Sequence, residues 1–425
     1  MNAPVPRASA QQGLRIGYVF SQFPVLTEAF AVSDIAALEA QGQNVRVFTM
    51  KPKPRGSGGL RRVAGVPDDL IVSPPTLAGA LRWPLLLWRY GRAALQLAAA
   101  AMGELGRSPA AAILAFLCIP RALEIADDAM MSGLDVVHIF WSRQGGMVLP
   151  VLRSAGASCV RSAFVGAYDL VVDDFLVGLT LRSANVVFSH AETNRDFAQA
   201  RAGDGVPVRI IRRGIPLLRT SSEKRDPFAW ITASALTPPK NVEAVLRAFA
   251  LARASDDRLN LTICGDGPDR ERLEALSAQL GIGNSVQFAG HVPRDELYKR
   301  LNRAGLFLLL SKKPSERLPN VLKEALWAGC AVIASPSDGI DELIPNDRLG
   351  TVVDPDDIDA IVRTSVRMLG QSDEDADARR AEARAFIEAN FSSDRSMAEY
   401  VEAWTSCRSR RSERQSACSC ETPVQ

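Results

Sequence analysis

Short apolar runs alternate with amphipathic stretches along most of the chain. Each run is bounded by polar residues, a pattern typical of strands buried on both faces of a parallel sheet. Between the runs, apolar residues recur three or four positions apart, as on one face of a helix. We therefore predict strands at 14–20, 45–50, 136–141, 229–233 and 305–310. Strands that alternate with helices in this way predict an α/β protein with doubly wound parallel sheets.

The chain has 425 residues, which is too many for one ordinary hydrophobic core, so we expect two domains. The strand-and-helix pattern pauses at a polar connector near residue 220 and then starts again. The expected organisation is a disordered N-terminus at 1–13, a first domain at 14–219 with a helical insert at 76–132, a second domain at 220–390, a crossover helix at 391–405 and a disordered tail at 406–425.

The insert at 76–132 has an unusual composition. Tryptophan and leucine, including Trp83 and Trp88, are interleaved with Arg82, Arg89 and Arg92. The pattern predicts two or three helices. An amphipathic helix rich in Arg and Trp can lie in a membrane interface. The alternative is a helical subdomain packed on the sheet, and the sequence leaves both interpretations open.

The net charge of +2 hides an asymmetry between the two halves. Residues 1–215 contain 22 Lys and Arg against 16 Asp and Glu, whereas residues 216–405 contain 24 against 30. A basic first half favours an anionic partner, such as a lipid headgroup or a phosphate-linked acceptor. We expect no nucleic acid, because no basic block is interleaved with aromatic residues.

The sequence pattern predicts neither a targeting segment nor a metal-binding site. The N-terminus lacks the charged and then apolar regions of a signal peptide, and no apolar run reaches the ~18 residues that a membrane-spanning helix needs. Four of the seven cysteines stand singly in apolar runs, as in a reduced cytoplasmic protein. With three histidines in the chain, a His-rich metal site is not expected.

The candidate chemistry is concentrated at 314–335. This stretch follows the predicted strand at 305–310 and reads as a loop, a helix that Gly329 ends, and a second buried strand. In such a unit, ligands bind beyond the carboxyl ends of the strands. Glu316 lies in the loop and Glu324 lies in the helix, so both carboxylates can accept bonds from sugar hydroxyls. First-turn N–H groups, including those of Leu318 and Asn320, can hold a phosphate or a hydroxyl.

From the residues alone, the favoured interpretation is that Glu316 is a capping acid and Glu324 part of a solvated helix face. However, the Glu-x7-Glu pattern with Leu318-Pro319 after the first Glu resembles the donor signature of family 4 of the retaining glycosyltransferases. The resemblance implies a GT-B fold, with two Rossmann-like domains facing across a cleft. It also implies that Glu316 contacts the donor sugar and that Glu324 binds the nucleotide ribose, with Leu318, Pro319 and Asn320 beside the donor.

Other strand ends of the second half fit the same resemblance. Lys240 would place one cation at the donor diphosphate, and Gly265 and Gly267 would let the backbone approach the donor closely. His291 and Val292 follow the next strand and complete the expected donor side. Taken alone, the Gly-x-Gly is a weak signal, since it is usually just a turn.

The run Ser21-Gln-Phe-Pro-x-Leu-Thr-Glu resembles the acceptor-side loop of bacterial exopolysaccharide transferases in this family. The resemblance implies acceptor-side roles for five residues: Ser21, Gln22, Phe23, Thr27 and Glu28. The alternative is a capped helix start without a ligand. In the same half, Asp169 follows the predicted strand near 162 and is a candidate catalytic residue.

Two departures from the family pattern affect the expected activity. Ala235 stands where the family usually has an arginine that helps to neutralise the leaving diphosphate. Gly166 stands where the family has a histidine near the donor sugar. Another cation, such as Arg143 or Arg213, could substitute for the arginine. Otherwise, the protein would be slow or dependent on a partner.

The expected function is therefore that of an enzyme: transfer of a sugar, with retention, from a nucleoside diphosphate sugar to a glycan or lipid-linked acceptor in cell-surface polysaccharide synthesis. The nucleotide sugar is a substrate, and we expect no cofactor and no metal. The expected location is the cytoplasm, peripheral at the inner face of the plasma membrane. The alternative is a catalytically weak or inactive nucleotide-sugar-binding subunit of a polysaccharide assembly. A dinucleotide enzyme is disfavoured, because no G-x-G-x-x-G follows Phe20.

Overall fold

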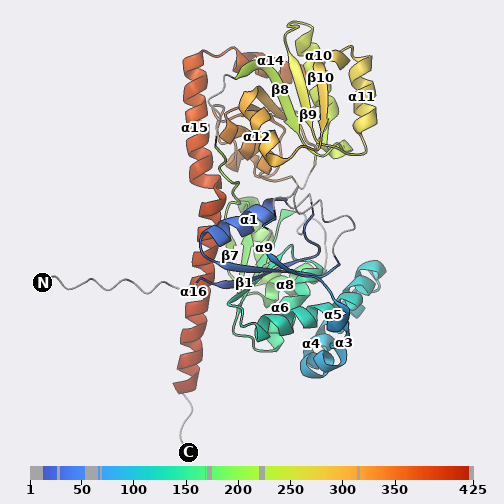
Figure 1. The fold of residues 1–425 in the computed structure, drawn as a ribbon, viewed down its shortest axis with the longest axis vertical. Helices are drawn as coiled ribbons and strands as arrows, with labels where there is room; N and C mark the ends of the chain where they lie inside the picture. Colours follow the sequence, from blue (N-terminus) through green and yellow to red (C-terminus); the bar gives the residue numbers. More distant parts are fainter. Residues whose placement is uncertain are drawn as a thin grey trace, which may run out of the picture.

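The computed structural model describes residues 13–25, 29–52, 66–67, 69–167, 169, 175–219, 225–313 and 316–420, and describes side chains as far as residue 413. The described chain forms two parallel sheets, each with its own layer of helices on both faces (Figure 1). The predicted fold class, with two doubly wound α/β domains, is therefore confirmed.

The first sheet has seven parallel strands in the order β3-β2-β1-β4-β5-β6-β7. The strand order reverses between β1 and β4, and such a point is where doubly wound sheets bind ligands. The strands are β1 Arg15–Phe20, β2 Asn44–Thr49, β3 Ile71–Ser73, β4 Val136–Phe140, β5 Val160–Phe164, β6 Val186–Ser189 and β7 Val208–Ile210. The connecting helical segments are α1 Ala29–Ala40, η2 Gln144–Met147, α6 Val148–Ser154, α8 Phe175–Ser183, η3 Glu192–Asn194 and α9 Arg195–Ala202.

The second sheet has six parallel strands in the order β10-β9-β8-β11-β12-β13, and its order reverses between β8 and β11. The strands are β8 Asp226–Ala233, β9 Asn260–Cys264, β10 Val286–Gly290, β11 Ala304–Leu309, β12 Ala331–Ala334 and β13 Thr351–Val352. The helical segments are η4 Pro238–Lys240, α10 Val242–Arg253, α11 Arg270–Gln279, η5 Gly283–Ser285, α12 Arg294–Arg303, α13 Asn320–Ala328, η6 Ile340–Glu342 and α14 Ile358–Leu369.

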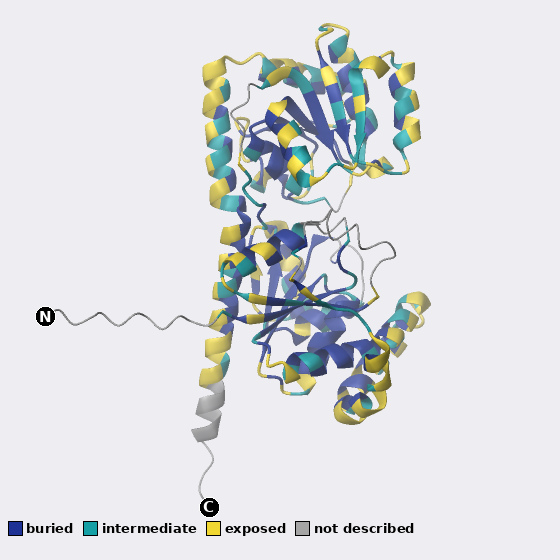
Figure 2. Cartoon of the chain, viewed as in Figure 1, coloured by how far each residue is buried: buried dark blue, intermediate teal, exposed yellow. Residues whose placement is uncertain are grey.

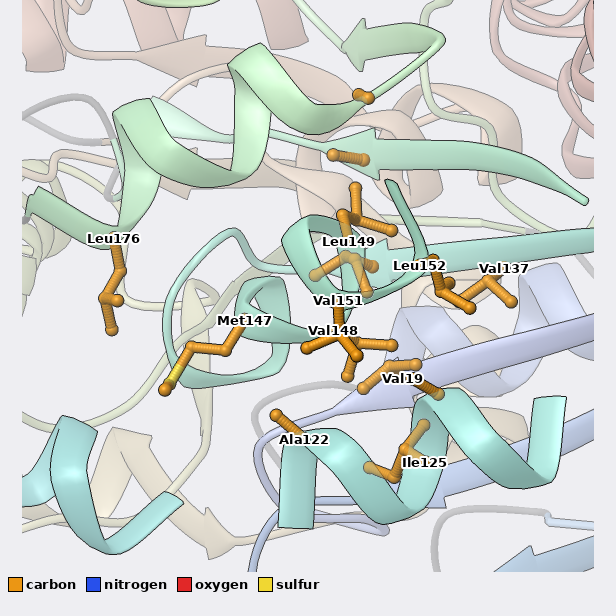
Figure 3. Packing of buried hydrophobic residues seen from close by; sticks show 14 of the residues in the cluster. Val19, Ala122, Ile125, Val137, Met147, Val148, Leu149, Val151, Leu152 and Leu176 are labelled. Atoms are coloured by element: carbon orange, nitrogen blue, oxygen red, sulfur yellow. The ribbon is translucent and has the colours of Figure 1, made fainter. Parts of the chain in front are cut away.

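The insert forms three helices, α3 Leu77–Leu81, α4 Trp83–Glu104 and α5 Pro109–Met131. Figure 3 shows Ala122 and Ile125 of α5 beside Val19 of β1 and the side chains of α6, so α5 belongs to the core of the first domain. The buried guanidinium of Arg121 donates to the Thr49 carbonyl at 2.9 Å and to the Ser73 carbonyl at 2.6 Å. These bonds hold α5 at the ends of β2 and β3.

The helix α5 is long and apolar enough, by length and composition, to cross a membrane, contrary to the sequence expectation. However, 56% of its most apolar window is buried inside the protein. The core helix of a globular domain meets the same test, because it is apolar on the sides that pack. The burial of α5 against the first sheet accounts for its composition.

The two last helices, α15 Asp373–Phe391 and α16 Ser393–Cys420, run along both domains (Figure 1). In α15, Ile387 and Phe391 are buried in the core of the second domain. In α16, Tyr400 and Trp404 are buried in the core of the first domain, where the Trp404 indole N–H donates to the Ser162 hydroxyl at 2.9 Å. Helix α16 therefore completes the core of the first domain, although it follows the second domain in the sequence.

The expected disorder at 406–425 is wrong for residues 406–420, which continue α16. Cys407 is buried, the Arg408 guanidinium lies 3.1 Å from the Asp135 carboxylate, and Arg411 donates to the Ala157 carbonyl at 2.8 Å. Arg408 and Arg411 thus anchor this part of α16 to the first domain.

Candidate active site

The predicted donor loop lies at the carboxyl ends of β11 and β12, where it leads into α13. The Ser311 hydroxyl and the Lys312 N–H both donate to the Pro239 carbonyl, at 3.1 Å and 2.8 Å. These bonds hold the loop after β8 against the loop after β11. A small cavity between the strand ends and the loop is lined by Leu309, Ser311, Glu316, Pro319, Leu322, Ala334, Ser335, Ser337 and Ile340.

Lys240 and Glu316, which sequence reasoning placed at different parts of one donor, contact each other directly. Their ammonium and carboxylate groups form an ion pair that is largely shielded from solvent. The second carboxylate oxygen, Glu316 Oε2, is buried and has no hydrogen-bond partner among the described residues. A buried acceptor without a donor is costly, so this oxygen is available to a hydroxyl-bearing ligand in the cavity.

Glu324 lies in α13 and is buried, which excludes the solvated helix face as its setting. Its Oε1 lies 3.6 Å from Nε of Arg294 in α12. Burial raises the pKa of the Glu324 carboxyl to about 7, although Arg294 and Lys323 oppose the shift. Arg294 also donates to the Ser33 hydroxyl of α1 at 2.6 Å, so one guanidinium links the predicted ribose site to the first domain.

Lys323 is a buried cation that sequence reasoning missed. Its ammonium donates to the Arg213 carbonyl at 2.8 Å and to the Asn320 side-chain oxygen at 3.0 Å. Burial, with Arg213 nearby, lowers the pKa of Lys323 to about 7. The sequence feature that could have identified it is a lysine directly before Glu324 in a mainly apolar helix. The side-chain oxygen of Asn320 is therefore engaged by Lys323.

The loop residues between the two acids also contact the first domain. The Arg317 guanidinium donates to the Asn194 side-chain oxygen and lies 2.9 Å from the Asp338 carboxylate. Leu318 is buried and has a positive φ of 46°, and Pro319 directly precedes α13 in an extended conformation. The loop is therefore held from both sides.

The two glycines after β9 are required by loop packing. A Cβ on Gly265, whose φ is 134°, would lie 1.8 Å from the Ser234 carbonyl oxygen, and one on Gly267 would lie 2.3 Å from that of Leu236. The glycines therefore let the loops after β8 and β9 touch, which is a packing explanation for the Gly-x-Gly.

The last two predicted donor-side residues, His291 and Val292, lead into α12. His291 is exposed, while Val292 packs against the same hydrophobic cluster as Leu318 and Leu322. Through Arg294, the first residue of α12, this segment reaches Glu324. The structure thus gathers the segments carrying Lys240, Glu316, Glu324 and Val292 at one edge of the second sheet.

The predicted acceptor-side residues have mixed settings. Ser21 Oγ lies 3.5 Å from Gln144 Oε1, and the Gln22 amide donates to the Pro52 carbonyl at 2.9 Å. Phe23 is a buried core residue whose ring centroid lies 4.9 Å from that of Phe20, so its side chain is taken up by packing. Thr27 and Glu28 lie outside the described residues.

The exit of β5 explains why a histidine is missing there. The buried Asp169 carboxylate accepts from the Gly166 N–H at 3.1 Å. A Cβ on Gly166 would lie 2.4 Å from the Trp141 ring, so no side chain fits without moving that ring. The neighbouring Tyr168 lies outside the described residues.

Arg213 does not replace the missing arginine at position 235. Its guanidinium pairs with Asp34 and lies over the rings of Phe30 and Phe140 at 4.3 Å and 4.6 Å. Burial raises the pKa of Asp34 even though Arg213 opposes the shift. The pair is therefore part of the first domain's packing. Ala235 itself is exposed, so a longer side chain has room there.

A larger cavity, of about 200 Å³, lies away from these residues between η3, η6 and the junction of α15 and α16. Its arginines already pair with its acids, Arg195 with Glu192, Arg212 with Glu342 and Arg395 with Glu399. We therefore place the candidate site at the Glu316 loop. Within the described ranges, no group of three His, Cys, Asp or Glu residues could hold a metal ion.

Residues 217–386 match the family model of Glycosyl transferases group 1. The amylovoran biosynthesis glycosyltransferase AmsK of Erwinia amylovora is 27% identical over 206 residues, which are 46% of this chain and 50% of that protein. The GDP-mannose-dependent alpha-(1-6)-phosphatidylinositol monomannoside mannosyltransferase of Mycolicibacterium smegmatis is 32% identical over 158 residues, which are 36% of this chain and 40% of that protein. The matched segments span half or less of each relative's length.

The structure is also similar to that of Anabaena Alr3699/HepE in complex with UDP. The TM-score is 0.67 at 16% identity, and the match covers 92% of this chain and 100% of that chain. At this level of identity, the likeness concerns the fold, and it confirms the two-domain arrangement that the resemblance implied.

Proposed function

Residues 217–386 carry a Glycosyl transferases group 1 domain, and from this premise we propose that the protein transfers a sugar from a nucleoside diphosphate sugar to a glycan or lipid-linked acceptor, with retention. The observation that supports this most directly is the Lys240–Glu316 ion pair at the carboxyl end of β11. It joins one cation suited to a diphosphate to one carboxylate suited to sugar hydroxyls.

In the proposed mechanism, the donor rearranges this ion pair. The diphosphate draws the Lys240 ammonium toward itself, and sugar hydroxyls donate to Glu316, including its unpartnered Oε2. The bond between the anomeric carbon and the phosphate oxygen then breaks while the acceptor oxygen bonds on the same face. The acceptor proton passes to the departing phosphate. The chain's contribution is positioning and positive potential on the leaving group.

A transfer assay with purified full-length protein tests the proposal. UDP-, GDP- and ADP-sugars are each combined with a panel of glycan and lipid-linked acceptors, and the product's anomeric configuration is determined by NMR. UDP and GDP donors deserve equal weight, because HepE was solved with UDP and the mannosyltransferase relative is GDP-mannose-dependent. Nucleotide-sugar binding without any product across the panel would support the non-catalytic subunit instead.

We also propose that the acceptor is met in the cytoplasm, at the inner face of the plasma membrane. The names of two relatives support the acceptor class, because one acts in amylovoran biosynthesis and one on a phosphatidylinositol monomannoside. The role in exopolysaccharide or other cell-surface polysaccharide synthesis follows from the same comparison. Fractionation of cells that express the protein would locate it.

Replacing Glu324 with alanine is expected to weaken nucleotide affinity by roughly 1–3 kcal/mol, the scale of a lost charge-assisted hydrogen bond. The reason is that ribose hydroxyls would lose their carboxylate acceptor. Isothermal titration with the preferred nucleotide measures the change. The matched control is Glu296→Ala in α12, which removes a partly exposed acid that pairs with Arg300. Equal losses of nucleotide affinity in both variants would show that Glu324 does not bind the ribose.

Nucleotide affinity is also expected to rise with pH. With a pKa of about 7, Glu324 is mostly protonated at pH 6 and mostly ionised at pH 8, and the ionised form is the better acceptor for ribose hydroxyls. The affinity should therefore increase by up to about tenfold over this interval. The pH step should vanish in Glu324→Gln. A step that persists in this variant would belong to another group, such as Lys323.

A further inference from the structure

The outer surface of the insert is apolar in a way that the fold does not explain. In α4, Leu85, Trp88 and Leu95 are 60%, 84% and 72% exposed, and in α3, Leu77 and Leu81 are 87% and 83% exposed. Figure 2 shows these two helices at the edge of the first domain, with exposed positions along their outer side. We call these five residues the outer face.

The opposite side of α4 is apolar as well. Leu86, Tyr90 and Leu97 are buried against α5 in the core of the first domain. This inner side already provides the apolar surface that holds α4 in place, so the outer face contributes nothing to packing within the described chain. A large exposed apolar patch of this kind marks an interaction site.

The structure changes the charge pattern that the sequence suggested. Arg82 and Arg89, which lie beside the outer face, both pair with Asp127 near the end of α5, and Arg82 also lies 3.1 Å from Asp128. Arg92 and Arg107 are exposed, and no ion pair holds them within the described ranges. The cations available to a partner are therefore Arg92 and Arg107.

We propose that the outer face inserts into the headgroup and acyl boundary of an anionic bilayer, with Arg92 and Arg107 contacting lipid phosphates. Leucine and tryptophan on one side of a helix, with cations beside them, are the composition that lies in a membrane interface. The one acid in α3 and α4 is Glu104, at the last position of α4, so charge complementarity favours anionic lipid over an average protein surface. The inference rests on the proposed function in one respect: a lipid-linked acceptor would be met at this membrane contact.

The rigidity of the insert makes the docking directional. Arg121 bonds α5 to the ends of β2 and β3, and α4 packs along α5. A bilayer that holds the outer face therefore orients the whole first domain, rather than a tethered helix.

Co-sedimentation with vesicles of phosphatidylglycerol and phosphatidylcholine tests this proposal. Wild-type protein is expected to bind at low salt, and binding should fall several-fold in high salt without disappearing, because the apolar share is insensitive to salt. Replacing Leu81, Leu85, Trp88 and Leu95 together with glutamine should lower the partition coefficient at least tenfold at both salt concentrations. Replacing Arg92 and Arg107 with glutamine should remove mainly the salt-sensitive share.

The matched control replaces exposed apolar residues elsewhere: Leu251 and Val366, which are 43% and 65% exposed in the second domain, are changed to glutamine and should leave vesicle binding intact. Every variant is also tested for nucleotide binding, which should not change and which reports on the donor site separately. The proposal is overturned if wild-type protein does not bind at low salt, or if the quadruple variant binds like wild type. A wild-type dimer that the quadruple variant abolishes, without vesicle binding, would identify a second copy as the occupant.

Discussion

Replacing Lys240 with alanine is expected to lower the rate of sugar transfer by about 100-fold or more, the scale for removing one group that stabilises developing charge. The loss acts twice, because the diphosphate loses a cation and Glu316 loses its ion-pair partner. Single-turnover kinetics at saturating donor measures the change. The control is Lys312→Ala, which removes a neighbouring lysine that is more exposed and pairs with Asp356. An unchanged rate of sugar transfer in Lys240→Ala would contradict the assignment of Lys240 to the donor diphosphate.

A complementary substitution tests the missing cation. Ala235 is exposed and precedes Leu236 in the loop that also carries Lys240, so Ala235→Arg adds a guanidinium near the proposed diphosphate. We expect this variant to raise the transfer rate and to rescue part of the loss in Lys240→Ala. An inactive wild-type protein that gains turnover from Ala235→Arg would mark it as a weakened enzyme.

Replacing Glu316 with alanine is expected to reduce turnover by about 100-fold or more while changing nucleotide affinity little. The proposed contact is with the sugar and not with the nucleotide, so binding of a free nucleoside diphosphate does not depend on it. Rapid-quench kinetics and calorimetry together separate the two effects. Because Lys240 and Glu316 touch, their double variant should lose less than the product of the single losses. If Glu316→Ala and Glu324→Ala both bind and react like wild type, the donor site lies elsewhere.

Local sequence pattern was sufficient to predict most of the fold. Runs such as Leu306–Leu309 are apolar on both faces because the sheet is covered by helices on both sides. The helix at α10 was predictable from its apolar spacing, and the positive φ of Gly329 fits the predicted end of α13. These features depend on neighbours along the chain, which a pattern can record.

The partners of charged residues were not predictable, because they come from distant parts of the chain. Arg294 meets Ser33 across 261 positions, and Lys323 meets the Arg213 carbonyl across 110. Arg82 and Arg89 have no acid within helical spacing in the sequence. Their partner Asp127 comes within reach because α5 folds back on α4. Spacing therefore indicated where the acids of the candidate site lie, but not which cations hold them.

The position of α16 has a consequence for how the protein is made. Trp404 lies 5.5 Å from His138 and Tyr400 lies 4.2 Å from Phe188, measured between ring centroids, so the core of the first domain is incomplete until the last helix has emerged from the ribosome. The first domain therefore cannot complete its core during its own synthesis. Its sheet stays partly uncovered until the second domain and α16 have been synthesised. Expressing the two domains as separate gene halves split near residue 220 would leave the first half with an open apolar groove and the second with an unpaired helix.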